Sequence, residues 1–156
     1  MPANTPSLSP TAMLLGFVAA AIAVLTVHQS IVYVLASAKV LPATSQAWSM
    51  ATIAPLGLPK IVSDIFWGGL WGSLFAVVWP KIPGGAMWLR GLIFGLLVAL
   101  FSNWMIVPFI KGTLLKFPNQ VFFGGFDPTR MMATLLILGG FGLTTGLVYG
   151  IMRARN

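Results

Sequence analysis

Cysteine is absent from this chain of 156 residues, and acidic residues are almost absent. The chain has two Asp and Glu residues in total, one His and nine Lys and Arg residues. Without cysteine there is no disulfide, no thiolate metal site and no thiol nucleophile. One His and two carboxylates are also too few for a three-ligand zinc centre. The sequence therefore predicts a protein that is not an enzyme and that carries neither a metal nor a cofactor.

Charged residues of either sign are scarce, and this scarcity indicates the fold class. They make up 7% of the chain, whereas apolar residues make up 58%. Soluble domains have about 25% charged residues. Because each crossing of a bilayer needs about 20 apolar residues, the chain has room for four crossings with their loops. We predict an all-α integral membrane protein with four transmembrane helices and two longer interfacial loops on one face.

Four apolar runs give the expected positions of the helices. They lie at about 12–37, 59–79, 88–110 and 129–152, and together they form one transmembrane domain over residues 12–156. Residues 1–11 are polar and rich in Pro, and we expect a disordered lead-in there. The link between the second and third helices is short, which favours an antiparallel pair of neighbours. Asp127 before Pro128 predicts the N-terminal cap of the fourth helix.

A cleaved signal peptide is the alternative interpretation of the first apolar run. Ala36-Ser37-Ala38 is typical of a cleavage site. However, no basic residue precedes the run, which is longer than the ~7 to 15 apolar residues of a signal. His28-Gln29-Ser30 also interrupts it. We therefore interpret the run as a membrane-spanning helix.

Small residues recur at four-residue spacing in two of the expected helices. In the second, Gly68 and Gly72 follow Asp64 along one stripe. In the fourth, the stripe consists of Gly142, Gly146 and Gly150. Residues four apart lie on one face of a helix, and glycines there allow another helix to approach at backbone distance. These five glycines are predicted helix-packing positions, within the chain or in a homo-oligomer.

Three polar residues are expected at similar depth near the face that carries the long loops. Counted along each helix, His28, Asp64 and Asn103 lie roughly 7 to 12 Å from that face. Such a layer suits a site that handles protons or a ligand. It also suits an interhelical hydrogen-bond cluster in which Lys60 compensates Asp64, and this is the interpretation that we favour. A third interpretation makes His28 an axial ligand to a haem or pigment, with a Met or a second subunit as partner.

The aromatic and basic residues are expected at the membrane boundaries. Trp48, Trp79, Trp88 and Trp104 are interpreted as interface residues, and Trp67 with Trp71 as a pair facing lipid or a partner. The basic residues are spread over the loops, which argues against a nucleic-acid surface. Arg153 and Arg155, close to the end of the fourth helix, favour cytoplasmic termini. The similar stretches 66–70 and 122–126 hint at a two-helix repeat.

One stretch resembles a known family. Trp79-Pro80-Lys81-Ile82, then Trp88-Leu89 before Gly91-Leu92, then Pro108 before Lys111-Gly112 are similar to the helix two to helix three region of uncharacterised YagU-like proteins. These are four-helix proteins of the bacterial inner membrane. The resemblance implies that location and implies no catalytic residue.

The sequence thus favours a non-enzymatic accessory or assembly component of a membrane complex. The alternative is a small oligomeric transporter or channel that uses His28, Asp64 and Asn103. The expected partners are the lipid bilayer and further subunits of the same or another chain.

Overall fold

The computed structural model describes residues 9–54, 56–116, 118 and 120–155. Helices make up 76% of the chain. Residues 1–8 of the expected lead-in lie outside the described part. Residues 9–11 belong to the first helix and its cap, because Pro10 takes the first helical position and the Ser9 hydroxyl accepts a hydrogen bond from the Ala12 amide.

Within the described residues, four helical segments are long and apolar enough to cross a membrane. The first consists of α1 (Pro10–Ala23), a π-helical turn (Val24–His28) and α2 (Gln29–Ser37). The second is α3 (Lys60–Val78), which ends in a 3-10 turn at Trp79–Lys81. The third consists of α4 (Met87–Val98), a π-helical stretch (Ala99–Ile106), α5 (Val107–Phe109) and a further π-turn (Ile110–Leu114). The fourth is α6 (Pro128–Ala154). The prediction of four such helices is confirmed.

The third segment runs past its expected end, and the π-helical turns explain how. Pro108 has no N–H to donate, so an α-helix is normally broken there. Here Pro108 lies between two π-helical stretches, and the segment continues to Leu114. Asp127 caps α6 as expected, since its carboxylate accepts hydrogen bonds from the amides of Thr129 and Arg130 at 2.8 and 3.1 Å.

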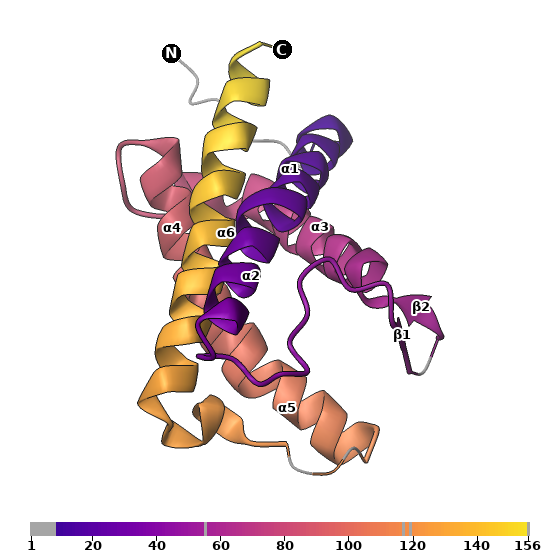
Figure 1. The fold of residues 1–156 in the computed structure, drawn as a ribbon. Coiled ribbons are helices and arrows are strands. Elements are labelled where there is room, and N and C mark those ends of the chain that lie inside the picture. Colours follow the sequence, from indigo (N-terminus) through magenta and orange to yellow (C-terminus); the bar gives the residue numbers. More distant parts are fainter. Residues whose placement is uncertain (1–8, 55, 117, 119, 156) are drawn as a thin grey trace.

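The four segments pack in the order α3, α1, α6, α4 rather than in chain order (Figure 1). Helix α1 contacts both α3 and α6, and α6 contacts both α1 and α4. The backbones of α3 and α4 come close at few positions, and the two helices meet mainly where Trp71 and Phe75 contact the Phe94 ring, within about two turns of the link. The expectation that they would be antiparallel neighbours is therefore wrong beyond their linked ends, because each packs along a different helix.

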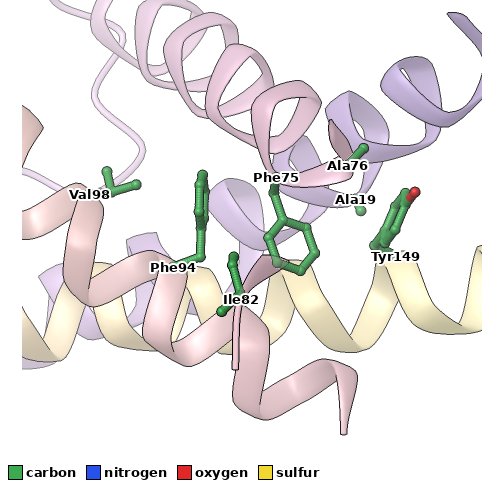
Figure 2. Packing of buried hydrophobic residues seen from close by; sticks show 7 residues of the cluster. All are labelled: Ala19, Phe75, Ala76, Ile82, Phe94, Val98 and Tyr149. Carbon is green, nitrogen blue, oxygen red and sulfur yellow. The ribbon is translucent and has the colours of Figure 1, made fainter. Parts of the chain in front are cut away.

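Buried aromatic rings connect the helices near that link. Phe75 of α3 is fully buried, with the ring of Phe94 on one side and that of Tyr149 on the other (Figure 2). The ring centroids are 5.2 and 5.7 Å away. Ala19 and Ala76 leave room for these rings. This cluster joins α1, α3, α4 and α6 at one level.

The two longer loops, one between α2 and α3 and one between Leu114 and α6, are structured. In the first, β1 (Thr52–Ile53) pairs antiparallel with β2 (Leu58–Pro59). In the second, residues 123–126 have positive φ and form a left-handed turn. The ring of its Phe123 lies 6.2 Å from that of Trp104, centroid to centroid, and Trp104 is 8% exposed and so is buried within the molecule. Residues 66–70 are instead α-helical, so the two similar stretches adopt unlike structures.

Candidate functional site

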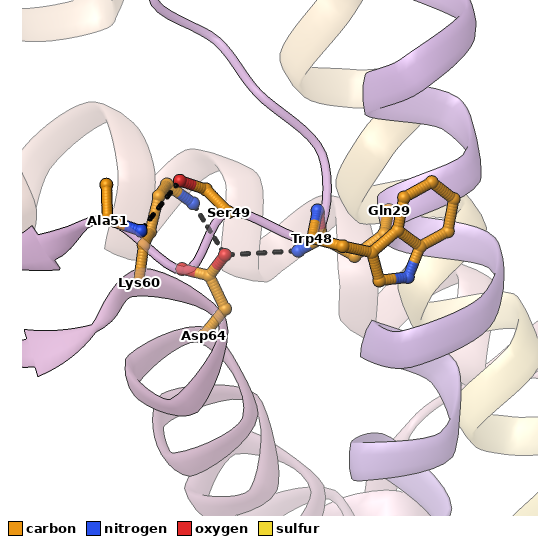
Figure 3. Close-up of polar contacts among 6 residues, drawn as sticks. All are labelled: Gln29, Trp48, Ser49, Ala51, Lys60 and Asp64. Atoms are coloured by element: carbon orange, nitrogen blue, oxygen red, sulfur yellow. Dashed lines mark hydrogen bonds and ion pairs between the residues drawn. The ribbon is translucent and has the colours of Figure 1, made fainter.

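Asp64 lies in the second turn of α3 and has two partners. Its Oδ2 accepts a hydrogen bond from Lys60 Nζ at 2.5 Å, one helical turn earlier. It also accepts one from Gln29 Nε2 at 3.1 Å, from the first turn of α2 (Figure 3). The carboxylate is therefore held by one positive charge and by one amide from another helix. This agrees with the hydrogen-bond interpretation of the layer as far as Asp64 is concerned.

Gln29 connects Asp64 to the long loop at residues 38–59. Its side chain is 1% exposed. While its Nε2 donates to Asp64, its Oε1 accepts a hydrogen bond from the Trp48 amide at 2.9 Å. A buried amide needs partners at both ends, and Gln29 has both. The sequence marked this residue only as an interruption of an apolar run.

The π-helical turn explains how Trp48 attaches to the first helical segment. In an α-helix the carbonyl of Leu25 would accept from the amide of Gln29. Here that amide donates to Val24 and Thr26, and the Leu25 carbonyl accepts from Trp48 Nε1 at 2.9 Å. Trp48 adopts a φ of +49°, a region that side chains usually avoid. Two specific hydrogen bonds hold it there.

The same loop also satisfies the free amides at the start of α3. The amide of Lys60 donates to the Ala51 carbonyl at 2.9 Å, and that of Ile61 donates to the Ser49 carbonyl at 3.0 Å. The first amides of a helix have no partner within the helix. The loop therefore joins the first helical segment, through Trp48, to the beginning of α3.

His28 is next to Gln29 in the chain. In the described part of the chain it makes no hydrogen bond to Asp64. Its ring contacts Phe141 of α6 edge to face, with centroids 6.4 Å apart. Its buried Nδ1 has no hydrogen-bond partner among the described residues. His28 thus points toward α6, whereas Gln29 next to it points toward α3.

Asn103 belongs to a different pair of helices. Its Nδ2 donates to Thr134 Oγ1 at 3.3 Å, and that hydroxyl donates to the Arg130 carbonyl at 2.9 Å. Asn103 therefore bonds to α6 and is exposed. The structure joins Asp64 to Gln29 and Asn103 to Thr134, and no described hydrogen bond connects the two groups.

The predicted packing glycines lie at helix contacts, but their surroundings differ. A Cβ added at Gly72 would overlap the carbonyl oxygen of Gly16 in α1. At Gly142 it would overlap the backbone of Gly91 and Gly95 in α4, and at Gly146 that of Met87 and Gly91. Its nearest neighbours would instead be side chains at Gly68, those of Val24 and Phe141, and at Gly150, that of Met87.

Several important positions were missed in the sequence. They are Gly16, Gly91 and Gly95, which contact the predicted glycines, and Gln29 and Trp48 of the polar cluster. Gly91 and Gly95 are four residues apart, so the same spacing rule would have found them. The bond between Gln29 and Trp48 depends on how a loop folds back, and no local pattern indicates it.

A metal site needs several ligating side chains close together. The described residues contain no group of three or more His, Cys, Asp or Glu side chains that could hold a metal ion. No protein-family model, curated protein or solved structure matches this chain. The resemblance to YagU-like proteins therefore stays a prediction.

Proposed function

We propose that this chain is a non-enzymatic accessory or assembly component of a complex in the bacterial inner membrane. It crosses the membrane four times with both termini in the cytoplasm. Its partners are lipid and other membrane subunits, with no role in binding nucleic acid. The observation that carries this proposal is the polar cluster of Gln29, Lys60 and Asp64. Its side chains form hydrogen bonds with one another and, through Gln29, with Trp48 of the long loop.

Exposed apolar side chains support insertion in a bilayer. Half or more of the side-chain surface is exposed at Leu14, Tyr33, Trp67, Phe101 and Leu136, which come from all four helical segments. Exposed apolar surface on every one of these segments is unfavourable in water and ordinary in lipid. Carbonate washing of membranes tests this step, and the chain should stay in the membrane pellet.

Asp64 supports a structural role for the polar cluster. An unpaired carboxylate inside a membrane costs about 2.5 to 3.5 kcal/mol on insertion scales and usually has a function. Asp64 is instead paired with Lys60 and Gln29, and through Gln29 it fixes the long loop. A cluster with such partners positions helices and a loop, as an assembly component requires.

The outer face of α3 is a surface that suits a partner helix. Phe66 and Trp67 contact each other edge to face at 5.6 Å while 51% and 58% exposed. Rigid aromatic side chains of this kind often dominate binding energy at interfaces. Purification in a mild detergent should recover a partner with the wild-type chain and lose it with Trp67→Ala. Leu14→Ala is the matched control, since Leu14 on α1 is 63% exposed, close to the 58% of Trp67.

A small transporter or channel is the second candidate, favoured by His28, whose buried Nδ1 has no partner in the described part of the chain. A buried imidazole nitrogen without a partner can accept a proton or a ligand. Purified chain in proteoliposomes, assayed with and without a pH gradient, separates the two functions. Flux that is lost in His28→Ala at normal abundance would support transport and contradict the accessory role.

Cytoplasmic termini are supported by basic residues held at one end of the bundle. Arg90 and Arg153 both contact the Trp79 ring, at 5.1 and 4.3 Å from its centroid. Short loops and helix ends rich in Lys and Arg favour the cytoplasm. A C-terminal reporter should be active in the cytoplasm, and activity in the periplasm alone would reverse the orientation.

A further inference from the structure

An apolar groove of about 280 Å³ lies between α3 and α4, where the two helices diverge from their link. Its α3 wall consists of Trp71, Leu74 and Val78. These residues are three and four apart, so they lie on one face of the helix. Leu74 is 42% exposed and forms the rim on this side.

The opposite wall repeats the pattern with Phe94, Leu97 and Val98 of α4 and Phe101 of the following π-helical stretch. Phe94 and Val98 are 5% and 4% exposed and form the floor of the groove, while Leu97 and Phe101 form the other rim. The groove is thus long, apolar and open to the side. Such a shape fits a hydrocarbon chain better than a polar ligand.

One end of the groove carries a positive charge that no acidic residue neutralises. Lys81 lines the groove where α3 ends, and it is exposed. The chain has two acidic residues, and both have other partners: Asp64 pairs with Lys60, and Asp127 caps α6. Asp64 precedes Lys81 on the same helix by a distance of roughly 25 Å.

Two arginines add positive charge at the same end of the helices. Arg90 and Arg153 both contact Trp79, two residues before Lys81. Arg90 lies in the first turn of α4, where the helix dipole disfavours a cation. Positive charge at this end of the helices is therefore not confined to Lys81.

We propose that this groove binds one anionic phospholipid, with an acyl chain between α3 and α4 and the phosphate beside Lys81. The inference rests on the proposed insertion in a membrane. Basic residues beside gaps between membrane helices are a known means of holding anionic head groups. A second copy of the chain in the same orientation is disfavoured, because it would bring a second set of these cations to the same end.

The test uses the full chain in nanodiscs that contain equal amounts of phosphatidylglycerol and phosphatidylcholine. After transfer to detergent, native mass spectrometry counts the lipids retained per chain. We expect phosphatidylglycerol to be retained preferentially. Lys81→Gln should lower its retention roughly five-fold, the fall expected for removing one basic residue beside an anionic lipid. Leu97→Trp, which fills the groove, should lower retention of both lipids.

Lys116→Gln is the matched control, because it removes a cation from the loop at the opposite end of the third segment. Equal retention of both lipids, or equal retention by Lys81→Gln and Lys116→Gln, would overturn the proposal.

A crosslinking experiment tests for a second copy in the groove. The chain has no cysteine, so Phe101→Cys introduces a single thiol as the crosslinking probe. A disulfide-linked dimer through this position would assign the groove to a second copy. Failure of the carbonate test would overturn the proposed insertion itself, whereas loss of lipid preference in inserted protein overturns this inference alone.

Discussion

Helices α4 and α6 approach each other through four glycines, whereas α1 and α3 approach through two. An added Cβ would overlap the partner's backbone at Gly91, Gly95, Gly142 and Gly146 in the first pair. In the second pair the same is true only of Gly16 and Gly72. The first pair therefore keeps backbone contact over successive turns, while the second touches closely at one turn and then diverges.

Polar side chains are found where the second pair diverges. On one side of the crossing, the Ser73 hydroxyl donates to the Met13 carbonyl at 3.0 Å. On the other, Asp64 accepts from Gln29 at 3.1 Å. In lipid, helices associate through close packing and interhelical hydrogen bonds, not through a hydrophobic drive. The comparison indicates that hydrogen bonds substitute for backbone contact where the glycine spacing is not repeated on both helices.

The largest effect is expected from Gly146→Leu, in the pair with repeated contact. The added side chain meets the Met87 carbonyl and the backbone of Gly91, and neither can move unless the helix moves. We expect a loss of stability on the order of 1 to 3 kcal/mol, near the upper value. Gly72→Leu should cost somewhat less, because the first helical segment and α3 stay joined through the bond between Gln29 of α2 and Asp64.

Size-exclusion chromatography after heating in detergent measures this difference. Leu97→Ala is the control, since Leu97 is 42% exposed and contributes less packing. Wild-type behaviour of both Leu variants would contradict the packing argument. Loss of an oligomer with an intact monomer would place the glycines at a subunit interface.

Gln29→Leu tests the polar half of the comparison. It leaves the Trp48 amide without its partner and removes one of the two hydrogen bonds to Asp64. A buried polar group without a partner costs about 1 to 3 kcal/mol. Thermal unfolding followed by circular dichroism should show this loss. Gln120→Leu is the control with the same chemical change, because Gln120 bonds only within its own loop, to Pro118. Equal stability of the two variants would contradict a role for the cluster in joining α2 and α3.

Some of this arrangement could be predicted from the sequence, because it depends on residues close together in the chain. Apolar length gave four helices, and the Asp127-Pro128 pair gave the start of α6. Four-residue spacing located Gly72, Gly142 and Gly146 at helix contacts. These features follow from the period of a helix and the chemistry of its first turn.

The pairing of helices and the attachment of the loop could not be predicted in this way. A short link indicates that helices are joined, but the glycines determine which helix each one follows. Trp48 reaches Leu25 because a π-helical turn displaces one backbone bond, and nothing in the local sequence marks that turn. The similar stretches at residues 66–70 and 122–126 also show that local sequence does not determine the structure here. The first is α-helical, and the second contains a left-handed turn.

Trp48→Phe should have a smaller effect than Gln29→Leu, because it removes one hydrogen bond and keeps a ring. The lost bond, from Nε1 to the Leu25 carbonyl, is worth about 1 kcal/mol. Amide hydrogen exchange should become faster at Lys60 and Ile61, whose amides donate to the same loop. Trp67→Phe on the exposed face of α3 is the control and should leave these amides unchanged. Unchanged exchange in Trp48→Phe would show that the loop holds its place without the indole.

The smallest effect is expected from Gly150→Ala, which tests where the repeated contact of α4 and α6 ends. The new Cβ would lie 3.1 and 3.2 Å from Cβ and Cγ of Met87. Met87 has a flexible side chain, so a shift of a few tenths of an ångström relieves the contact. Replacing Gly by Ala inside a helix favours folding by up to about 1 kcal/mol. The two effects nearly cancel, and we expect a thermal midpoint equal to or slightly above that of the wild type.

The control is Gly146→Ala, whose thermal midpoint should fall below that of the wild type, because there the Cβ meets the Met87 carbonyl and not the side chain. Equal losses in both Ala variants would mean that the close contact extends a full turn further toward the C-terminus of α6.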